Sequence, residues 1–308
     1  MSIVETAILF NCAYEVLPAI VSWPAQLHAE HARGADTAAA LPESSADSLD
    51  AASYGVLIVV GGPQYRVGSH RQFLHLARRL AAAGYPAMRF DYRGMGDGGG
   101  AIRPFDQVGE DIGAAIDAFQ RCCPSVRRVI LWGLCDAASA ALLYVEASGD
   151  ERVAGLVVLN PWVRSETSLA QTQIKHYYGQ RLLKREFWLK LFRGQLAITQ
   201  SLRSLLRAAI TARRGQGTKV SRQCFQERMA AGWRHFSGRL LLVLSGEDYT
   251  AKEFLEFVRT SPAWTGLLEA SNVRRVDLDD ADHTFSSEVW RKQVEDATLA
   301  WLDTLSAT

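Results

Sequence analysis

Cysteine is scarce in this chain, and its few cysteines show no pairing pattern. The 308 residues include five of them, namely Cys12, Cys122, Cys123, Cys135 and Cys224. An odd number of cysteines in a long chain, without the paired spacing of a zinc site, argues against a disulfide scaffold and indicates a reducing compartment. No other metal-binding or cofactor motif is evident, so we expect neither a metal nor a cofactor.

The chain also lacks the features of an exported or membrane-spanning protein. Its first residues, Met1 to Thr6, carry no basic stretch of the kind that opens a secretory signal. The apolar stretch at residues 7–23 is interrupted by Asn11, Glu15 and Pro18, which excludes a spanning helix. This stretch is typical of the two strands of a hairpin. We therefore expect a cytoplasmic protein without an integral membrane segment.

The net charge is only +1, yet the charge is unevenly distributed. Residues 165–238 contain 14 Lys and Arg, 3 Glu and no Asp, which leaves about +11 there and about −10 elsewhere. This basic segment is either a solvated helical surface or a surface for an anionic substrate or partner, including peripheral contact with an anionic membrane. No nucleic-acid recognition motif accompanies the charge, so we do not expect nucleic acid as a partner.

Continuous apolar strands alternate with helical segments along most of the chain. Hydrophobic residues make up 48% and charged residues 22%, as in ordinary soluble proteins. Buried strands are expected at 56–60, 86–90, 129–134, 153–159, 239–244 and 273–278. Helices are expected at 70–83, 108–120 and 288–305. This alternation predicts an α/β fold with a mostly parallel sheet that is covered by helices on both faces.

Two segments interrupt the alternation. Residues 28–53 are rich in Ala, Ser, Asp and Glu without apolar periodicity, which predicts a surface insertion. Residues 165–238 contain helical patterns but no strand, which predicts a helical basic cap. The remaining residues, 1–164 and 239–308, are then the α/β core.

The most informative segment joins a buried strand to an alanine-rich helix at residues 129–140. At the junction lies Gly133-Leu134-Cys135-Asp136-Ala137, a cysteine flanked at two residues' distance by small residues. Small neighbours are needed where a nucleophile is held in strained backbone geometry, and the helix N-terminus favours a thiolate. The alternative interpretation is that Cys135 is a buried cysteine with a purely structural role. Ser139 is an alternative nucleophile, but no strand directly precedes it.

Two residues at later strand ends are suited to activate this thiol. Asp248 follows the expected strand 239–244, and His283 follows the strand 273–278. The order of nucleophile, acid and base along the chain is that of a catalytic triad at the carboxyl edge of a parallel sheet. Glu247 is the rival acid, whereas Asp282 should point elsewhere. We therefore expect a Cys135–Asp248–His283 triad.

The oxyanion hole should combine the backbone N–H of Asp136 with a donor from the loop after Val60. That loop reads Gly61-Gly62-Pro63, and proline has no N–H, so Gln64 is the expected second donor through its backbone or side chain. The Asp136 carboxylate has two opposing effects. It disfavours a neighbouring thiolate but is favourable at a helix N-terminus.

Basic residues gather in two loops near the expected site. They are Arg66, His70 and Arg71 in the loop after residue 60, and Arg93 in the glycine-rich loop 91–98. Such a cluster can clamp a carboxylate or phosphate of the substrate. The alternative is a structural role, in which the arginines pair with Asp91 and Asp97.

These motifs resemble the α/β-hydrolase superfamily. More narrowly, Gly61 to Arg71, Asp91 to Asp97 and Gly133 to Ser139 are similar to the exosortase A system-associated hydrolase 1 family. The resemblance covers nearly the whole chain except residues 28–53. It implies a role in bacterial exopolysaccharide and exosortase (PEP-CTERM sorting) functions.

The cysteine elbow is also similar to that of dienelactone hydrolase. Serine hydrolases with lids, such as monoglyceride lipases and the serine aminopeptidase-like group, resemble the chain as well. The chain departs from these at Cys135 and at the missing His-Gly of the oxyanion loop.

The sequence therefore predicts an acyl hydrolase that acts on a small-molecule ester or thioester through a thioacyl-enzyme. Two alternatives remain open. The same triad can transfer the acyl group to an amine or alcohol. The chain can also be a non-catalytic hydrolase-fold module that binds a polysaccharide-assembly partner through its basic cap.

Overall fold

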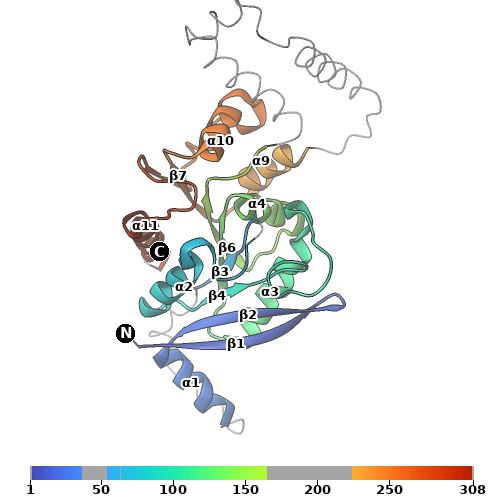
Figure 1. Ribbon diagram of the computed structural model, residues 1–308, viewed down its shortest axis with the longest axis vertical. Helices are drawn as coiled ribbons and strands as arrows, with labels where there is room; N and C mark the ends of the chain where they lie inside the picture. Colours follow the sequence, from blue (N-terminus) through green and yellow to red (C-terminus); the bar gives the residue numbers. More distant parts are fainter. Residues whose placement is uncertain (1, 37–53, 63, 165–223, 307–308) are drawn as a thin grey trace, which may run out of the picture. The chain divides into compact units, whose positions relative to one another are not determined.

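The computed structural model describes residues 2–36, 54–62, 64–164 and 224–306. Residues 1–163 and 225–308 form one compact unit. Its described part contains a single eight-stranded sheet in the order β1-β2-β4-β3-β5-β6-β7-β8 (Figure 1). The strands are β1 (Ile3–Cys12), β2 (Glu15–Pro24), β3 (Tyr54–Val59), β4 (Ala87–Phe90), β5 (Arg128–Leu134), β6 (Val153–Leu159), β7 (Arg239–Ser245) and β8 (Val273–Leu278).

The hairpin β1–β2 is antiparallel and joins the sheet through β4, whereas all strands from β4 to β8 are parallel. Leu57, Leu131, Leu156 and Leu240 lie side by side on neighbouring strands, and none is exposed to solvent. Continuous burial of this kind is expected where helices cover both faces of a parallel sheet. Because the strands are parallel, their carboxyl ends share one edge.

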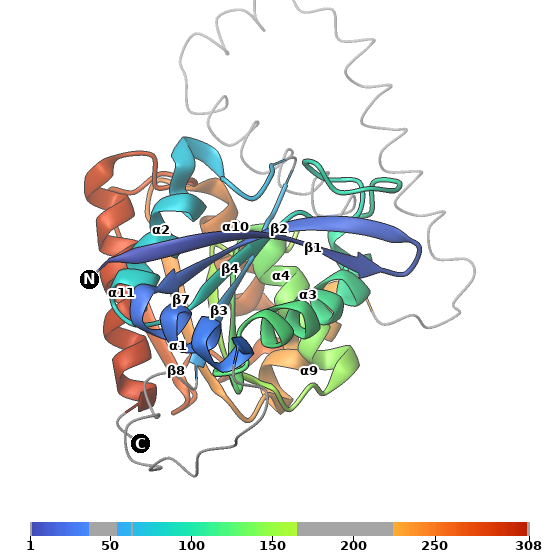
Figure 2. The ribbon, with the colours of Figure 1, turned by 90° about the horizontal axis from the view of Figure 1, so that it is seen from below.

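Helices cover the sheet on two sides (Figure 2). Helices α2 (Gln72–Ala82) and α11 (Glu288–Ser306) contact each other on one face. Helices α3 (Gly109–Cys122), α4 (Asp136–Ser148) and α9 (Phe225–His235) lie on the other, with α4 in contact with both neighbours. Helix α10 (Tyr249–Thr260) follows β7. Short 3₁₀ turns are η3 (Ser69–Arg71), η4 (Phe105–Gln107) and η6 (Pro262–Trp264).

Helix α4 lies at the centre of its layer, and its residues 137–145 are all buried. Its alanine-rich first turns allow this close packing. Gly232 of α9 lies directly against the Leu142 carbonyl of α4, where a Cβ atom would clash with the backbone. The packing of α4 fixes the position of its first residue, which follows the elbow.

The α/β fold with a mostly parallel sheet is confirmed, and so is the opening hairpin. One expectation changes within residues 28–53, because their first part belongs to helix α1 (Ala25–Asp36). The Trp23 ring packs against the rings of His28 and His31, with centroids 5.3 and 5.5 Å away. This contact holds a helix whose own sequence shows little apolar periodicity.

Most of the expected insertion and most of the expected cap, residues 37–53 and 165–223, lie outside the described residues. The last part of the expected cap segment, residues 225–235, is helix α9 on the core helix α4. No helix among the described residues is long and apolar enough to cross a membrane.

Candidate active site

Cys135 lies in a sharp turn between β5 and α4. Its backbone has φ 63° and ψ −123°, a left-handed conformation that costs a non-glycine residue roughly 1–3 kcal/mol. The surroundings hold this geometry, because the Cys135 N–H donates to the Leu159 carbonyl at 2.9 Å. A Cβ atom on Gly133 would lie 2.6 Å from the Ala137 backbone, so the turn requires glycine there. This is the elbow that the small residues predicted.

His283 and Asp248 meet across the loops after β8 and β7. The His283 Nδ1 lies 2.8 Å from Asp248 Oδ2. Asp248 is buried and caps α10, and its carboxylate accepts the backbone N–H groups of Thr250 at 2.9 Å and Ala251 at 3.3 Å. These bonds fix the carboxylate that in turn fixes the imidazole ring.

The third expected member lies on the same imidazole. Hydrogen bonds to Asp248 and then to Cys135 raise the pKa of His283 to about 10. With Nδ1 engaged by Asp248, Nε2 is the nitrogen that remains for the thiol. The ring thus lies between a carboxylate and a sulfur atom, and both stabilise its protonated form. The structure brings together the three side chains that the sequence paired over a distance of nearly 150 residues.

The alternative residues are placed differently. Glu247 is exposed, with its carboxylate 3.8 Å from Lys252 Nζ. Asp282 accepts the backbone N–H of Thr284 and bonds Ser286, so it points away from the triad as expected. Ser139 is buried within α4 and donates its hydroxyl to the Trp162 carbonyl at 2.7 Å. A hydroxyl used in this way is not placed as a nucleophile.

Sequence reasoning missed a polar network under the histidine loop. Asn160 follows β6, is fully buried and has φ 44°. Its Oδ1 accepts the Ser245 N–H, and its Nδ2 donates to Ser245 Oγ, both at 2.9 Å. Nδ2 also approaches the His283 carbonyl at 3.4 Å, and Ser245 Oγ donates to the Asp282 carbonyl at 3.0 Å. An asparagine at the end of an apolar strand was the available signal.

Two of the expected substrate-binding arginines are engaged by carboxylates. Arg66 forms a short ion pair with buried Asp91 and a second with Asp97 at 2.8 Å. Arg93 is buried and pairs with Asp111 at 2.8 Å and with Glu110 at 2.7 Å. Both guanidinium groups therefore tie loops together, which is the structural alternative. Asp91 and Asp111 are buried, which makes these two carboxylates better partners for arginine than a solvated ligand would be.

His70 and Arg71 are exposed and both adopt left-handed backbone conformations, with φ 53° and 60°. Helix α2 for this reason begins at Gln72 and not at residue 70. Against the effect of burial, hydrogen bonds from Ser286 and Thr284 lower the pKa of Asp282, and His70 adds a smaller electrostatic effect, so His70 lies near the histidine loop. Of the four basic residues, these two present their side chains at the surface.

Hydrogen bonds within the loop after β3 involve Gln64, one of the two expected oxyanion donors. The Gln64 N–H donates to the Gly62 carbonyl at 2.8 Å, and Gln64 Oε1 accepts the Ser69 N–H at 3.0 Å. The backbone of Gln64 is thus used within its own loop, and only its side-chain amide N–H₂ is left for a ligand. The Gly62 N–H donates to Asp136 Oδ1 at 2.7 Å. The loop after β3 therefore meets the elbow through the Asp136 side chain.

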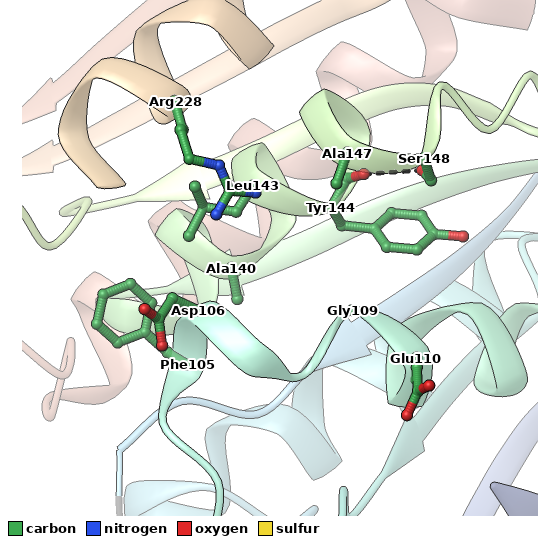
Figure 3. A pocket seen from close by; sticks show the side chains of 10 residues that line it. All are labelled: Phe105, Asp106, Gly109, Glu110, Ala140, Leu143, Tyr144, Ala147, Ser148 and Arg228. Atoms are coloured by element: carbon green, nitrogen blue, oxygen red, sulfur yellow. Dashed lines mark hydrogen bonds between the residues drawn. The ribbon is translucent and has the colours of Figure 1, made fainter. Parts of the chain in front are cut away.

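A cavity of about 270 Å³ lies beside α4 (Figure 3). Its lining includes Phe105, Leu143 and Tyr144 together with the charged Glu110 and Arg228. None of its lining residues belongs to the triad, so this cavity is separate from the elbow.

The sequence and the fold are similar to those of known hydrolases. Residues 55–218 match the family model Hydrolase_4, described as serine aminopeptidase, S33. The esterase Pf2001 of Pyrococcus furiosus has a TM-score of 0.60 at 13% identity, covering 98% of this chain and 91% of that one. Est1E of Butyrivibrio proteoclasticus, solved with ferulic acid bound, has a TM-score of 0.59 at 13% identity, covering 98% and 100%.

A lidless α/β serine hydrolase of Xanthomonas campestris has a TM-score of 0.52 at 12% identity, covering 96% and 94%. No curated protein matches the sequence. Identities this low show a shared fold. The family model, in contrast, spans more than half of the chain. The protein therefore belongs to the serine aminopeptidase S33 family of α/β-hydrolases, with a cysteine at its elbow.

Proposed function

We propose that this hydrolase cleaves an ester or thioester of a small molecule through Cys135 as nucleophile, His283 as acid and base, and Asp248 as the orienting carboxylate. The observation that carries the proposal is the imidazole of His283. It lies between the Asp248 carboxylate at 2.8 Å and the thiol of a strained strand-to-helix turn. A structural cysteine needs neither the strain nor the histidine.

The first chemical step follows from this arrangement. The Cys135 sulfur attacks the carbonyl carbon, a C–S bond forms, and the carbonyl π electrons move onto oxygen. The oxyanion collapses, the bond to the leaving alkoxide or thiolate breaks, and His283 supplies its proton to that group. The product is a thioacyl-enzyme with a neutral imidazole.

Hydrolysis of the thioacyl-enzyme needs that neutral imidazole as a base. The Cys135 hydrogen bond is one of the two leading causes of the raised pKa of His283. Acylation removes this partner, so the pKa of the ring falls and it can accept a proton from water. As His283 takes a proton from water, the resulting hydroxide attacks the thioester and the C–S bond breaks. The carboxylic acid leaves, and Cys135 returns as a thiolate beside the imidazolium.

The same intermediate supports a second candidate function. A thioester reacts readily with amines and alcohols, so the triad can serve an acyltransferase. The matching loop motifs suggest that either activity serves exopolysaccharide or exosortase functions in the cytoplasm. The basic segment 165–238 suggests an anionic substrate, an anionic membrane surface or a polysaccharide-assembly partner. If the site is inactive, the protein is a binding module for such a partner.

The test compares thiol reactivity with acyl transfer. Wild-type protein is treated with iodoacetamide at pH 7, and each cysteine is followed by mass spectrometry. Cys135 should react about ten- to a hundredfold faster than exposed Cys224. Buried Cys12, whose pKa burial raises to about 11, should react more slowly still.

The variant C135A should then lose the release of p-nitrophenol from short p-nitrophenyl esters and of thiol from acyl thioesters, by at least about 10³-fold. C224A is the matched control and should keep full activity. Slow, uniform alkylation of all cysteines would favour the binding module. Activity that survives in C135A would remove the proposed nucleophile.

A further inference from the structure

The carboxyl group of Asp136 accepts backbone N–H groups from which an oxyanion hole is expected in this fold. Its Oδ1 accepts the Gly62 N–H at 2.7 Å, and the backbone N–H groups of Asp136 and Ala137 also bond to the carboxylate. One donor follows the elbow cysteine, and another belongs to the loop after β3. These are the two positions from which the backbone of this fold binds a developing negative charge.

The loop is shaped around this carboxyl group. A Cβ atom on Gly61 would collide with Asp136 Oδ1 and would lie 2.6 Å from the Leu134 carbonyl. Gly62 has φ 62°, in the left-handed region that favours glycine. The two glycines thus allow the loop to approach the carboxyl group within hydrogen-bond distance. An acyl oxygen that uses the same N–H groups must compete with Asp136.

The titratable groups that face Asp136 come from three parts of the chain. Cys135 precedes it, buried Tyr92 faces it from the loop after β4, and His283 faces it from the loop after β8. Burial raises the pKa of Asp136, against the opposing effects of the backbone N–H groups and of His283. Among the described residues of the loop after β3, glycine backbone makes this contact.

We propose that the Asp136 carboxylate closes the oxyanion pocket, and that an acyl group reacts at Cys135 only when this carboxyl group is uncharged. The inference rests on the proposed function, because it assumes that Cys135 is the nucleophile. An ionised carboxylate repels the charge that develops on the carbonyl oxygen. A neutral carboxyl group keeps the Gly62 bond through Oδ1, and its O–H donates to that oxygen.

The proton on Asp136 is shared with the oxyanion in a hydrogen bond and is not transferred. The chemical balance of the acylation step is therefore unchanged.

The test uses two reactions of the same sulfur. Acylation by p-nitrophenyl acetate generates an oxyanion, whereas alkylation by iodoacetamide displaces iodide and needs no oxyanion donor. The ratio of the two rates at Cys135 removes changes in thiol reactivity. In the wild type this ratio should fall about tenfold per pH unit once Asp136 is ionised.

D136N is the matched variant, because its amide keeps an oxygen for Gly62 and offers an N–H in place of the carboxyl O–H. Its ratio should be independent of pH, and at pH 8 it should exceed that of the wild type by at least about tenfold. D136A, which frees the Gly62 N–H, should change in the same direction. Melting temperatures show whether the variants fold, and the wild-type pH profile tests the proposal without either variant.

A flat wild-type ratio would overturn the inference, and so would a lower ratio in both D136N and D136A across the pH range. Failure of the proposed function looks different. In that case Cys135 alkylates no faster than Cys224, and p-nitrophenyl acetate does not react at Cys135 at all.

Discussion

An aspartate lies at or next to each end of helix α4, and the pKa values of the two are shifted in opposite directions. Asp136 begins the helix, where the helix dipole should favour its ionised form, yet burial raises its pKa. Asp150 follows the C-terminus, where the dipole should disfavour ionisation. The Arg152 guanidinium nevertheless holds the pKa of Asp150 down at about 2. Position on the helix therefore does not decide the direction of either pKa shift.

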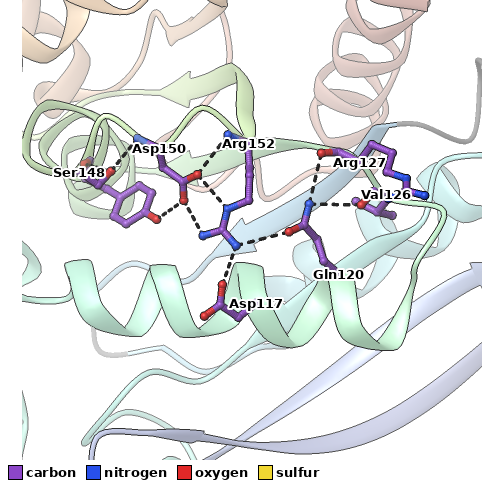
Figure 4. A network of polar contacts seen from close by, with 8 residues as sticks. Asp117, Gln120, Val126, Arg127, Ser148, Asp150 and Arg152 are labelled. Carbon is purple, nitrogen blue, oxygen red and sulfur yellow. Dashed lines mark hydrogen bonds and ion pairs between the residues drawn. The ribbon is translucent and has the colours of Figure 1, made fainter.

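Their partners explain the difference. At the C-terminal end, Arg152 bonds both oxygens of Asp150 at 2.8 and 2.9 Å and reaches Asp117 of α3 at 2.5 Å (Figure 4). Tyr144 adds a hydrogen bond to Asp150 at 2.6 Å. At the N-terminal end, the hydrogen-bond donors to the Asp136 carboxylate in the described part of the chain are backbone N–H groups. A balanced network stabilises the fold, whereas a carboxyl group with no counter-charge in hydrogen-bond contact is available for chemistry.

The largest expected effect is on the rate of catalysis, at the triad next to the N-terminus of α4. D248N should lower the rate of acyl-ester cleavage by about 10²- to 10⁴-fold, because the imidazolium loses the carboxylate that stabilises it. The helix cap should be kept, since asparagine also caps helices well, but the stability that Asp248 gives to protonated His283 should be lost. The measurement is p-nitrophenyl acetate turnover beside thermal unfolding. Near-normal turnover would show that Asp248 does not act on His283.

A second variant tests whether the triad also depends on the buried hydrogen bonds between Asn160 and Ser245. N160A should lower activity by about ten- to a hundredfold and destabilise the fold by about 1–3 kcal/mol, because it leaves Ser245 groups unpaired in a buried site. Asn160 is a positioning residue, so the pH profile should shift with the altered imidazole. S245A is the companion variant. If activity falls only in proportion to the folded fraction, Asn160 serves stability alone.

A substitution at the C-terminal end of α4 should change the free energy of unfolding but not the activity. R152M is expected to destabilise the protein by about 1 kcal/mol, a modest value because the Arg152 side chain is 38% exposed. Urea unfolding measures this change, and the rate of ester cleavage per folded molecule should stay at the wild-type value. A loss of activity would mean that the two ends of α4 are coupled.

The smallest effect is on the pH dependence of stability. Asp150 has a lowered pKa, so its contribution is present above its ordinary value of 3.8 and is lost as the pH falls towards about 2. His283 has a raised pKa, so its contribution is present below its ordinary 6.5 and is lost as the pH rises towards about 10. Urea unfolding between pH 2 and 10 should show a free energy of unfolding that falls on both sides, along an acid limb due to Asp150 and an alkaline limb due to His283.

Two variants separate these limbs. R152M should flatten the acid limb alone, and H283N should flatten the alkaline limb alone. An unchanged acid limb in R152M would assign the acid sensitivity to other carboxylates.

Much of the site could be predicted because it follows from chain order. Asp248 and His283 were expected at the ends of two apolar strands, and parallel strands bring their ends to one edge. Gln64 was the weaker expectation, since hydrogen bonds within its loop cannot be deduced from sequence. Asn160 was missed because its partners lie 85 residues away or more.

The sequence by itself determined the α/β architecture and the elbow, because apolar runs, small residues and strained turns act over a few neighbouring residues. Only the tertiary structure decided which charges are neutralised. From the sequence, Arg66 and Arg93 could either bind the substrate or tie loops together. In the structure they pair with the buried carboxylates of Asp91 and Asp111. The charge of a carboxyl group depends on burial and on partners distant in the chain, so folding alone distinguishes Asp136 from Asp150.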